Sequence, residues 1–91
     1  MEFIHGKNRI SVESEDGRTL AEVTFPEVSE GVVNIDHTYV SNELRGQGVA
    51  GRLMEELAGD LKESGRKATL TCSYAVGWFE KHPECEDLLA R

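Results

Sequence analysis

The residues with the clearest chemical potential form a glycine-rich stretch in the middle of the chain, Arg45-Gly46-Gln47-Gly48-Val49-Ala50-Gly51. Glycine inside a helix or strand costs about 0.5–1 kcal/mol relative to alanine, so glycines packed this closely indicate a turn. Glycines also let the backbone approach a ligand. The first turn of a following helix adds N–H groups that have no partners and carry partial positive charge. The stretch therefore predicts a site for phosphate or pyrophosphate.

Alternating polar and apolar residues predict the strands that hold this loop. The expected strands are Glu2–Ile4, Arg9–Glu13, Leu20–Phe25, Gly31–Val40 and Lys67–Cys72. Turns are expected at His5–Asn8 and Glu15–Gly17, and a loop at Pro26–Glu30. The strand before the glycines should place Val33, Ile35, His37 and Tyr39 on one face, and Val32, Asn34, Asp36, Thr38 and Val40 on the other.

Two helices are predicted after the glycine stretch. Apolar residues recur every four positions from Val49 to Leu61, which indicates an amphipathic helix over Val49–Ser64 that ends at Gly65. A shorter helix over Tyr74–His82 should stop before Pro83. A strand, a helix and a further strand in this order form a βαβ unit, so its two strands should be parallel.

Size and composition narrow the functional classes. Ninety-one residues predict a single domain over residues 1–91. The net charge of −7 argues against a nucleic-acid partner and is compatible either with a cationic substrate such as an amine or simply with solubility. Cys72 and Cys85 have no zinc-type spacing with the histidines, so no metal site is predicted. With no signal peptide and no membrane-spanning run, we expect a reduced, cytoplasmic protein.

Two phosphate motifs can be tested on the glycines. Read as GxGxxG, Gly46 to Gly51 match the dinucleotide fingerprint, but the acidic residue expected about 20 positions later is missing, since the following strand ends in Cys72-Ser73. No Lys-Ser or Lys-Thr follows the glycines, which excludes a Walker motif. The stretch also fits R/Q-x-x-G-x-G/A. In this pattern the chain resembles the GNAT superfamily of N-acetyltransferases, in particular its short single-domain branch.

Further pieces support this resemblance: His37-Thr38 late in a strand, Cys72 at the end of the next strand, and Lys81-His82-Pro83-Glu84 after an aromatic helix. The resemblance implies an α/β (α+β) fold, with an antiparallel meander and a βαβ unit whose parallel strands splay around the cofactor. It also implies acetyl-CoA as co-substrate. The residues expected to bind it are Thr38, Tyr39, Val40, Arg45, Gly46, Gln47, Gly48, Val49, Ala50, Gly51 and Arg52. For Arg45 and Arg52, solvated surface charge is the alternative.

The resemblance also suggests roles for three side chains in acyl transfer. Cys72 could accept the acetyl group as a nucleophile, or it could be a small core residue. His37 could act as general base toward an ammonium substrate, or it could be an ordinary histidine of a half-buried strand. Tyr74 could protonate the leaving thiolate.

Three hypotheses remain open from the sequence. The first is acetyl transfer from acetyl-CoA to an amine acceptor, either a small molecule or a protein lysine, by direct attack or through acetyl-Cys72. The second is a non-catalytic module that binds acetyl-CoA or CoA. The third is an interaction domain in which the glycine stretch is only a turn.

Overall fold

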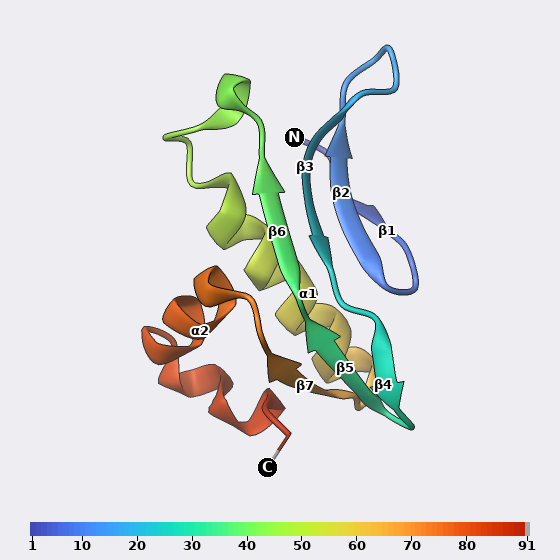
Figure 1. Cartoon of the computed structure of the whole chain (residues 1–91), viewed down its shortest axis with the longest axis vertical. Helices are drawn as coiled ribbons and strands as arrows, with labels where there is room; N and C mark the ends of the chain where they lie inside the picture. Colours follow the sequence, from blue (N-terminus) through green and yellow to red (C-terminus); the bar gives the residue numbers. More distant parts are fainter. Residues whose placement is uncertain (91) are drawn as a thin grey trace.

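The computed structural model describes residues 1–90. Seven strands are assigned in this part of the chain: β1 (Ile4–His5), β2 (Arg9–Glu13), β3 (Thr19–Thr24), β4 (Glu27–Ser29), β5 (Val32–Ile35), β6 (His37–Val40) and β7 (Lys67–Leu70). The helices are α1 (Val49–Ser64) and α2 (Ser73–Glu80), with 3₁₀ segments η1 (Asn42–Leu44) and η2 (Pro83–Leu88). Figure 1 shows their arrangement.

The strands form two sheets, which are linked by the segment in which β5 of one sheet is followed directly by β6 of the other. The first has the order β1-β2-β3-β6 and the second β4-β5-β7. Neighbours in the first sheet are antiparallel, whereas β5 and β7 run parallel. The antiparallel meander, the mixed α/β class and the parallel βαβ pair are therefore confirmed.

One expectation is wrong in a way that matters for the site. Gly31–Val40 is not a continuous strand, because it divides at Asp36 into β5 and β6, which belong to different sheets. The pairing register shifts by one residue at the break: the N–H of Asp36 donates to the carbonyl of Thr24 (3.2 Å), whereas within the first sheet Thr24 pairs with His37. The N–H of Asn34 donates to the carbonyl of Pro26 (2.8 Å), and proline has no N–H to return a bond.

The break reverses which side chains face inward. Val33 and Ile35 are fully buried, but His37 and Tyr39 are exposed while Thr38 and Val40 are partly buried. The prediction that His37 and Tyr39 share a face with Val33 and Ile35 is thus wrong. A shift of one residue moves every later side chain to the opposite face of the sheet.

Smaller corrections concern the ends of elements. β1 lies at Ile4–His5 rather than Glu2–Ile4, so His5 belongs to a strand and not to the turn. The expected loop at Pro26–Glu30 contains β4, which pairs with β5. β7 ends at Leu70, before Cys72. α1 and β2 have the expected bounds.

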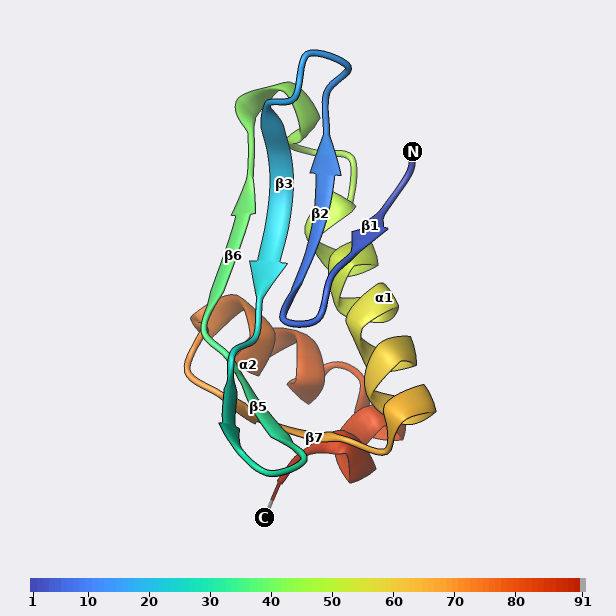
Figure 2. The ribbon, with the colours of Figure 1, turned by 90° about the vertical axis from the view of Figure 1, so that its right-hand side faces the viewer.

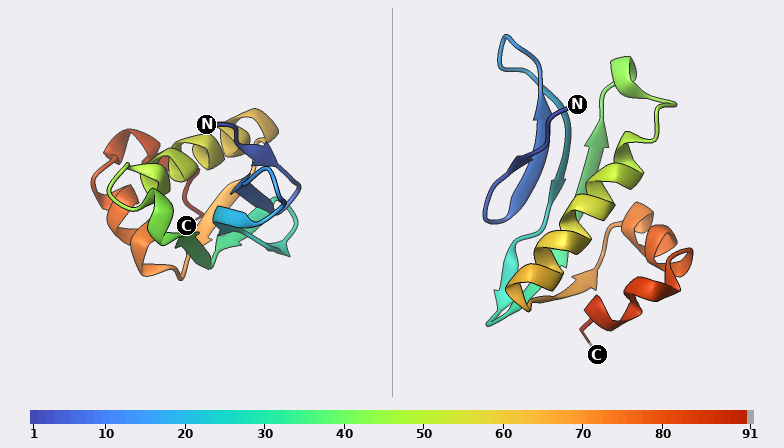
Figure 3. Two further views of the ribbon diagram at one scale, coloured as in Figure 1. Left: turned by 90° about the horizontal axis from the view of Figure 1, so that it is seen from above. Right: turned by 180° about the vertical axis from the view of Figure 1, so that it is seen from behind.

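Helix α1 covers one face of the strands, between the β1–β2 hairpin and α2 (Figure 3, right). Its buried residues are Val49, Leu53, Met54, Leu57, Ala58 and Leu61. They belong to one hydrophobic cluster that also contains Phe25, Ile35, Trp78 and Phe79. In the side view the first sheet and α1 form two layers, with α2 and β7 at the lower end (Figure 2). This packing leaves the start of α1 at the surface.

Candidate active site

The glycine loop joins η1 to α1 and has the backbone of an anion-binding turn. Gly46 (φ 81°) and Gly48 (φ 74°) have left-handed conformations, which glycine adopts without the steric cost that other residues have. A Cβ atom at either position would meet nothing within 4 Å. The backbone of the loop therefore faces open space, and a ligand could reach it directly.

The start of α1 has donors to offer. Gly48 is the N-cap, and no side chain caps the helix. In the described part of the chain, the backbone N–H groups of residues 46–51 form no hydrogen bond, and the first helical one runs from Arg52 to the carbonyl of Gly48 (3.2 Å). The helix dipole adds partial positive charge at the same end. The loop thus combines oriented donors with a favourable potential for an anion.

A pocket of about 180 Å³ opens at this loop. Most of the predicted cofactor residues line it, together with Tyr74: Val40, Leu44, Arg45, Gly46, Gly48, Val49, Ala50, Gly51 and Tyr74. Ligand clefts usually measure about 300–1,000 Å³, so this pocket could hold part of a larger ligand. Leu44 was not predicted, although it is the one apolar residue in the polar segment before the glycines.

Tyr74 connects the second helix to the loop. A Cβ atom at Gly51 would lie 3.5 Å from the Tyr74 hydroxyl, so this hydroxyl lies against the first turn of α1. Partial burial raises the pKa of the Tyr74 phenol, so the phenol is protonated at neutral pH. The structure thus places one predicted catalytic residue at the predicted cofactor loop.

Cys72 lies where the two sheets separate. Its N–H and that of Thr71 both donate to the carbonyl of Ile35 (3.1 Å each). Beyond this point β6 pairs with β3 while the chain after β7 turns into α2, so the two paths diverge (Figure 1). The Cys72 sulfur faces Thr38 across this divergence, with 3.5 Å between Sγ and Oγ1. The predicted splaying of the parallel strands is present here.

The environment of the Cys72 thiol favours its anion. Burial raises its pKa, but the Thr38 hydroxyl together with the nearby backbone N–H dipoles of Ala75, Tyr74 and Thr38 outweighs burial, so the net pKa is lowered. Cys72 is also the N-cap residue of α2, where a negative charge is stabilised by the helix dipole.

His37 lies on the other face of β6. Its Nε2 is 3.4 Å from Oε2 of Glu22, and about half of its side chain is exposed (53%). Glu22 is in turn bound by the guanidinium of Arg9 (2.7 Å). His37 and Cys72 therefore lie on opposite sides of β6, with His37 on the outer face of the sheet and Cys72 beside the inward-facing Thr38.

The remaining predicted binding residues have different environments. Arg45 lines the pocket, whereas the guanidinium of Arg52 lies over the ring of Phe3, 5.1 Å from its centroid. The side chain of Gln47 donates to the carbonyl of Glu43 (3.2 Å) and turns away from the helix start. Tyr39 is exposed on the outer face of β6 (43%).

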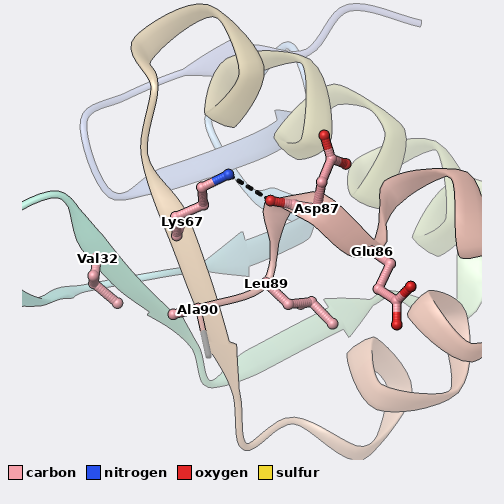
Figure 4. Close-up of a pocket in the computed structure, with 6 residues that line it drawn as sticks. All are labelled: Val32, Lys67, Glu86, Asp87, Leu89 and Ala90. Carbon is pink, nitrogen blue, oxygen red and sulfur yellow. Dashed lines mark hydrogen bonds between the residues drawn. The ribbon is translucent and has the colours of Figure 1, made fainter.

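A larger hollow of about 680 Å³ lies near the C-terminal end of the chain, away from the loop (Figure 4). It is lined by Val32, Lys67, Glu86, Asp87, Leu89 and Ala90. The Lys67 amine donates a hydrogen bond to the backbone carbonyl of Asp87 (Figure 4). None of the nucleophile, base or loop residues discussed above borders this hollow, so the candidate chemistry remains at the glycine loop.

Two further features bear on function. The described residues contain no group of three or more His, Cys, Asp or Glu that could hold a metal ion. No helix in residues 1–90 has the length and apolar character needed to cross a membrane.

Two sheets that separate beside a glycine loop and an uncapped helix start form a site suited to an anionic ligand, and comparison with known proteins gives the family. The model of the GCN5-related N-acetyl-transferase family matches residues 9–88. The chain therefore belongs to the GCN5-related N-acetyltransferase family, and its enzyme class is that of acetyl-CoA-dependent N-acetyltransferases. No curated protein matches the chain.

Solved structures agree with this assignment. A GCN5-like protein from Staphylococcus aureus, solved by NMR, is 34% identical with a TM-score of 0.80, and the match covers 98% of this chain and 87% of that one. An acetyltransferase from Bacillus cereus is 25% identical with a TM-score of 0.64, over 89% and 56% of the two chains. Tetrahymena GCN5 shares the fold at 13% identity, with a TM-score of 0.64 over 80% and 48%. The chain thus matches about half the length of these two larger proteins.

Proposed function

We propose that this chain transfers an acetyl group from acetyl-CoA to an amine acceptor through an acetyl-Cys72 intermediate. The observation that carries this proposal is the placement of Cys72 at the start of α2, 3.5 Å from the Thr38 hydroxyl. The next residue but one, Tyr74, reaches the glycine loop. A nucleophile, a proton donor and an anion site are therefore supplied by neighbouring segments.

In this proposal the loop binds the pyrophosphate of acetyl-CoA. The free N–H groups of residues 46–51 fit an anion, and Arg45 adds a cation at the same pocket. Arg52 could contribute if its side chain left Phe3. Thr38, Tyr39 and Val40 lie on β6, which pairs with β3 at one edge and, among residues 1–90, with no strand at the other. The unpaired edge offers backbone donors and acceptors to the rest of the cofactor.

The residues then have distinct roles in the chemistry. The Cys72 thiolate attacks the carbonyl carbon of the thioester, and the bond between that carbon and the sulfur of CoA breaks. Tyr74 gives its proton to the departing CoA thiolate. In the second half-reaction the amine nitrogen attacks the acetyl-cysteine, the Cys72 sulfur leaves, and the surplus proton on nitrogen passes to solvent, because His37 lies on the opposite face of β6 beside Glu22. The tyrosinate of Tyr74 then takes a proton back from solvent.

We also propose that residues 1–91 act as a single domain, which the common hydrophobic cluster of both sheets and both helices supports.

Cys72 and Cys85 are free thiols, which suits a reducing compartment such as the cytoplasm. The proposed partners are acetyl-CoA and an amine, either a small molecule or a protein lysine, rather than nucleic acid or a membrane.

The test uses the intact chain and two matched variants, Cys72→Ser and Cys85→Ser. Each is mixed with acetyl-CoA without acceptor and examined by intact-protein and peptide mass spectrometry. Wild type and Cys85→Ser should gain one acetyl group on Cys72 and release free CoA, whereas Cys72→Ser should not. With a panel of polyamines, amino sugars and lysine peptides, Cys72→Ser should lose transfer to the level of the uncatalysed reaction.

The contrary results separate the alternatives. Normal turnover by Cys72→Ser would show that the amine attacks acetyl-CoA directly. Binding of acetyl-CoA without transfer to any amine would favour the non-catalytic module.

A further inference from the structure

A side-chain contact joins the two sheets of this protein at the point where their backbones separate. Thr38 is on β6 of the first sheet and Cys72 follows β7 of the second, and their side chains meet at 3.5 Å. We propose that Thr38 is a positioning residue whose hydroxyl donates its hydrogen to Sγ of Cys72 and holds the sulfur, as a nucleophile, at the start of α2. This rests on the proposed function, since it assigns Cys72 the role of acetyl acceptor.

The direction of the hydrogen bond follows from the chemistry of the pair. With a neutral thiol, either the sulfur or the oxygen could donate. A thiolate can only accept, so the hydroxyl of Thr38 must then be the donor. In the described structure this hydroxyl has no other hydrogen-bond partner that would compete for its hydrogen. Hydrogen bonds to a charged acceptor are about twice as strong as those between neutral groups, so the contact should favour the anion.

The position of Thr38 is fixed by the first sheet. Thr38 pairs with Val23 of β3, which is fully buried. Residues paired directly across an antiparallel ladder point to the same face, so Thr38 points inward with Val23. A β-branched side chain on a strand also has few rotamers. The hydroxyl is therefore held toward Cys72 at little entropic cost.

The other groups that face the sulfur are dipoles, not charges. They are the backbone N–H groups of Tyr74 and Ala75 at the start of α2 and the N–H of Thr38. The Cys72 side chain forms no capping hydrogen bond at the start of α2, so these N–H groups act on the sulfur mainly as oriented dipoles. The nearest titratable neighbour on α2, Tyr74, lies against Gly51 of α1. On β6, His37 points to the outer face and pairs with Glu22.

The second cysteine provides an internal comparison. Cys85 lies in η2, is 6% exposed, and belongs to the hydrophobic core. Burial, followed by the nearby charge of Glu84, raises the pKa of its thiol. The two free thiols of one small domain thus have opposite environments. Cys72 is the one with a hydroxyl donor, so the proposal predicts that its reactivity depends on Thr38 and that of Cys85 does not.

The experiment follows alkylation of Cys72 by iodoacetamide from about pH 5 to pH 10, quantified by peptide mass spectrometry. The variants are Thr38→Val, which keeps the shape but removes the hydroxyl, and Thr38→Ser, which keeps the hydroxyl. Loss of one hydrogen bond to a thiolate should move the half-maximal pH of alkylation upward by about one unit in Thr38→Val. Thr38→Ser should stay close to wild type, and Cys85 should react alike in all three proteins.

An unchanged pH profile of Cys72 in Thr38→Val would overturn the proposal. If Thr38→Val does not fold, as judged by its melting curve, Thr38→Ala is measured in its place with the same expectation. The alkylation needs neither acetyl-CoA nor acceptor. A shifted profile without any acetyl-Cys72 would therefore support the positioning role while refuting the covalent route. Where transfer occurs, kcat should fall in Thr38→Val and recover in Thr38→Ser, with KM for acetyl-CoA unchanged.

Discussion

Gly48 has two roles, because it is the N-cap of α1 and also lines the pocket at the glycine loop. Its φ of 74° ends the loop and makes it the N-cap of α1. Any side chain there would have an unfavourable backbone conformation and would project into the open space beside the pocket. Gly59 is a useful contrast, because it lies within the same helix, is exposed, and has room for a Cβ atom without a positive φ.

We expect Gly48→Ala and Gly59→Ala to have opposite effects on stability. A left-handed alanine costs roughly 1–2 kcal/mol, whereas alanine in place of a helical glycine gains about 0.5–1 kcal/mol. Each kcal/mol should move the melting midpoint of a domain of this size by about 4–8 °C. Calorimetry would check this, and a Gly48→Ala protein that melts at or above the wild-type temperature would contradict the assigned conformation.

At the scale of elements, the N-terminal segment is fastened to α1 by side chains one helical turn apart. Phe3 packs against Arg52, while His5 contacts Glu56 through Nε2 (2.8 Å) and Asp60 through Nδ1 (2.7 Å). Strand β1 pairs with β2 through only two residues. These contacts with α1 therefore hold β1 at the edge of the sheet.

The His5 contacts should make stability depend on pH. The hydrogen bond with Asp60, opposed by burial and aided by Glu56, raises the pKa of His5. The stabilisation is fully present below the unfolded pKa of about 6.5 and is lost as the pH rises through the folded value. Because these groups are about one-third exposed, solvent screening limits the effect to about 0.2–1 kcal/mol.

We therefore expect His5→Gln to melt a few degrees below wild type at about pH 5.5, and the two proteins to converge near pH 9. Asp60→Asn removes the main partner and should reduce the same pH-dependent difference. Thermal melts over this range provide the measurement, and a gap that widens with rising pH would contradict the assigned ion pairs.

The sequence predicted the exact bounds of α1 and β2, but it did not predict that the strand before the glycines divides at Asp36. Apolar spacing from Val49 to Leu61 and glycines at both ends defined α1. Nothing local to Asp36 indicated that the strand changes sheets there, because the change depends on how the segment pairs with β3 on one side of Asp36 and with β4 on the other. Pairing with β5 likewise converted part of the expected loop after Pro26 into β4.

The same break limited what could be predicted of the site. The glycine loop was visible in composition because its chemistry is local. The contact of Thr38 with Cys72 was not, because regular alternation from Val33 would point Thr38 outward. The one-residue shift at Asp36 turns Thr38 inward, toward a residue 34 positions away. Long-range geometry of this kind depends on tertiary pairing, which a pattern of apolar residues does not contain.

At the scale of the whole molecule, the protein is acidic but carries positive groups at the end where the glycine loop lies. The net charge is −7, yet the loop end carries Arg45, Arg52 and the positive end of the α1 dipole. A cofactor that carries phosphate groups would be attracted to this end of the molecule.

Binding of acetyl-CoA at this end should stabilise the entire fold, because α1 contacts both the loop and the common hydrophobic cluster. A ligand at about 100 times its dissociation constant adds roughly 2.7 kcal/mol, which corresponds to a shift of about 10–20 °C in the melting midpoint of a domain this small. NAD also carries a pyrophosphate but belongs to the rejected GxGxxG interpretation, so it should cause little shift. Gly48→Ala should reduce the shift with acetyl-CoA, whereas Gly59→Ala should retain it. A chain that melts unchanged at saturating acetyl-CoA would show that the glycine loop is a turn and not a cofactor site.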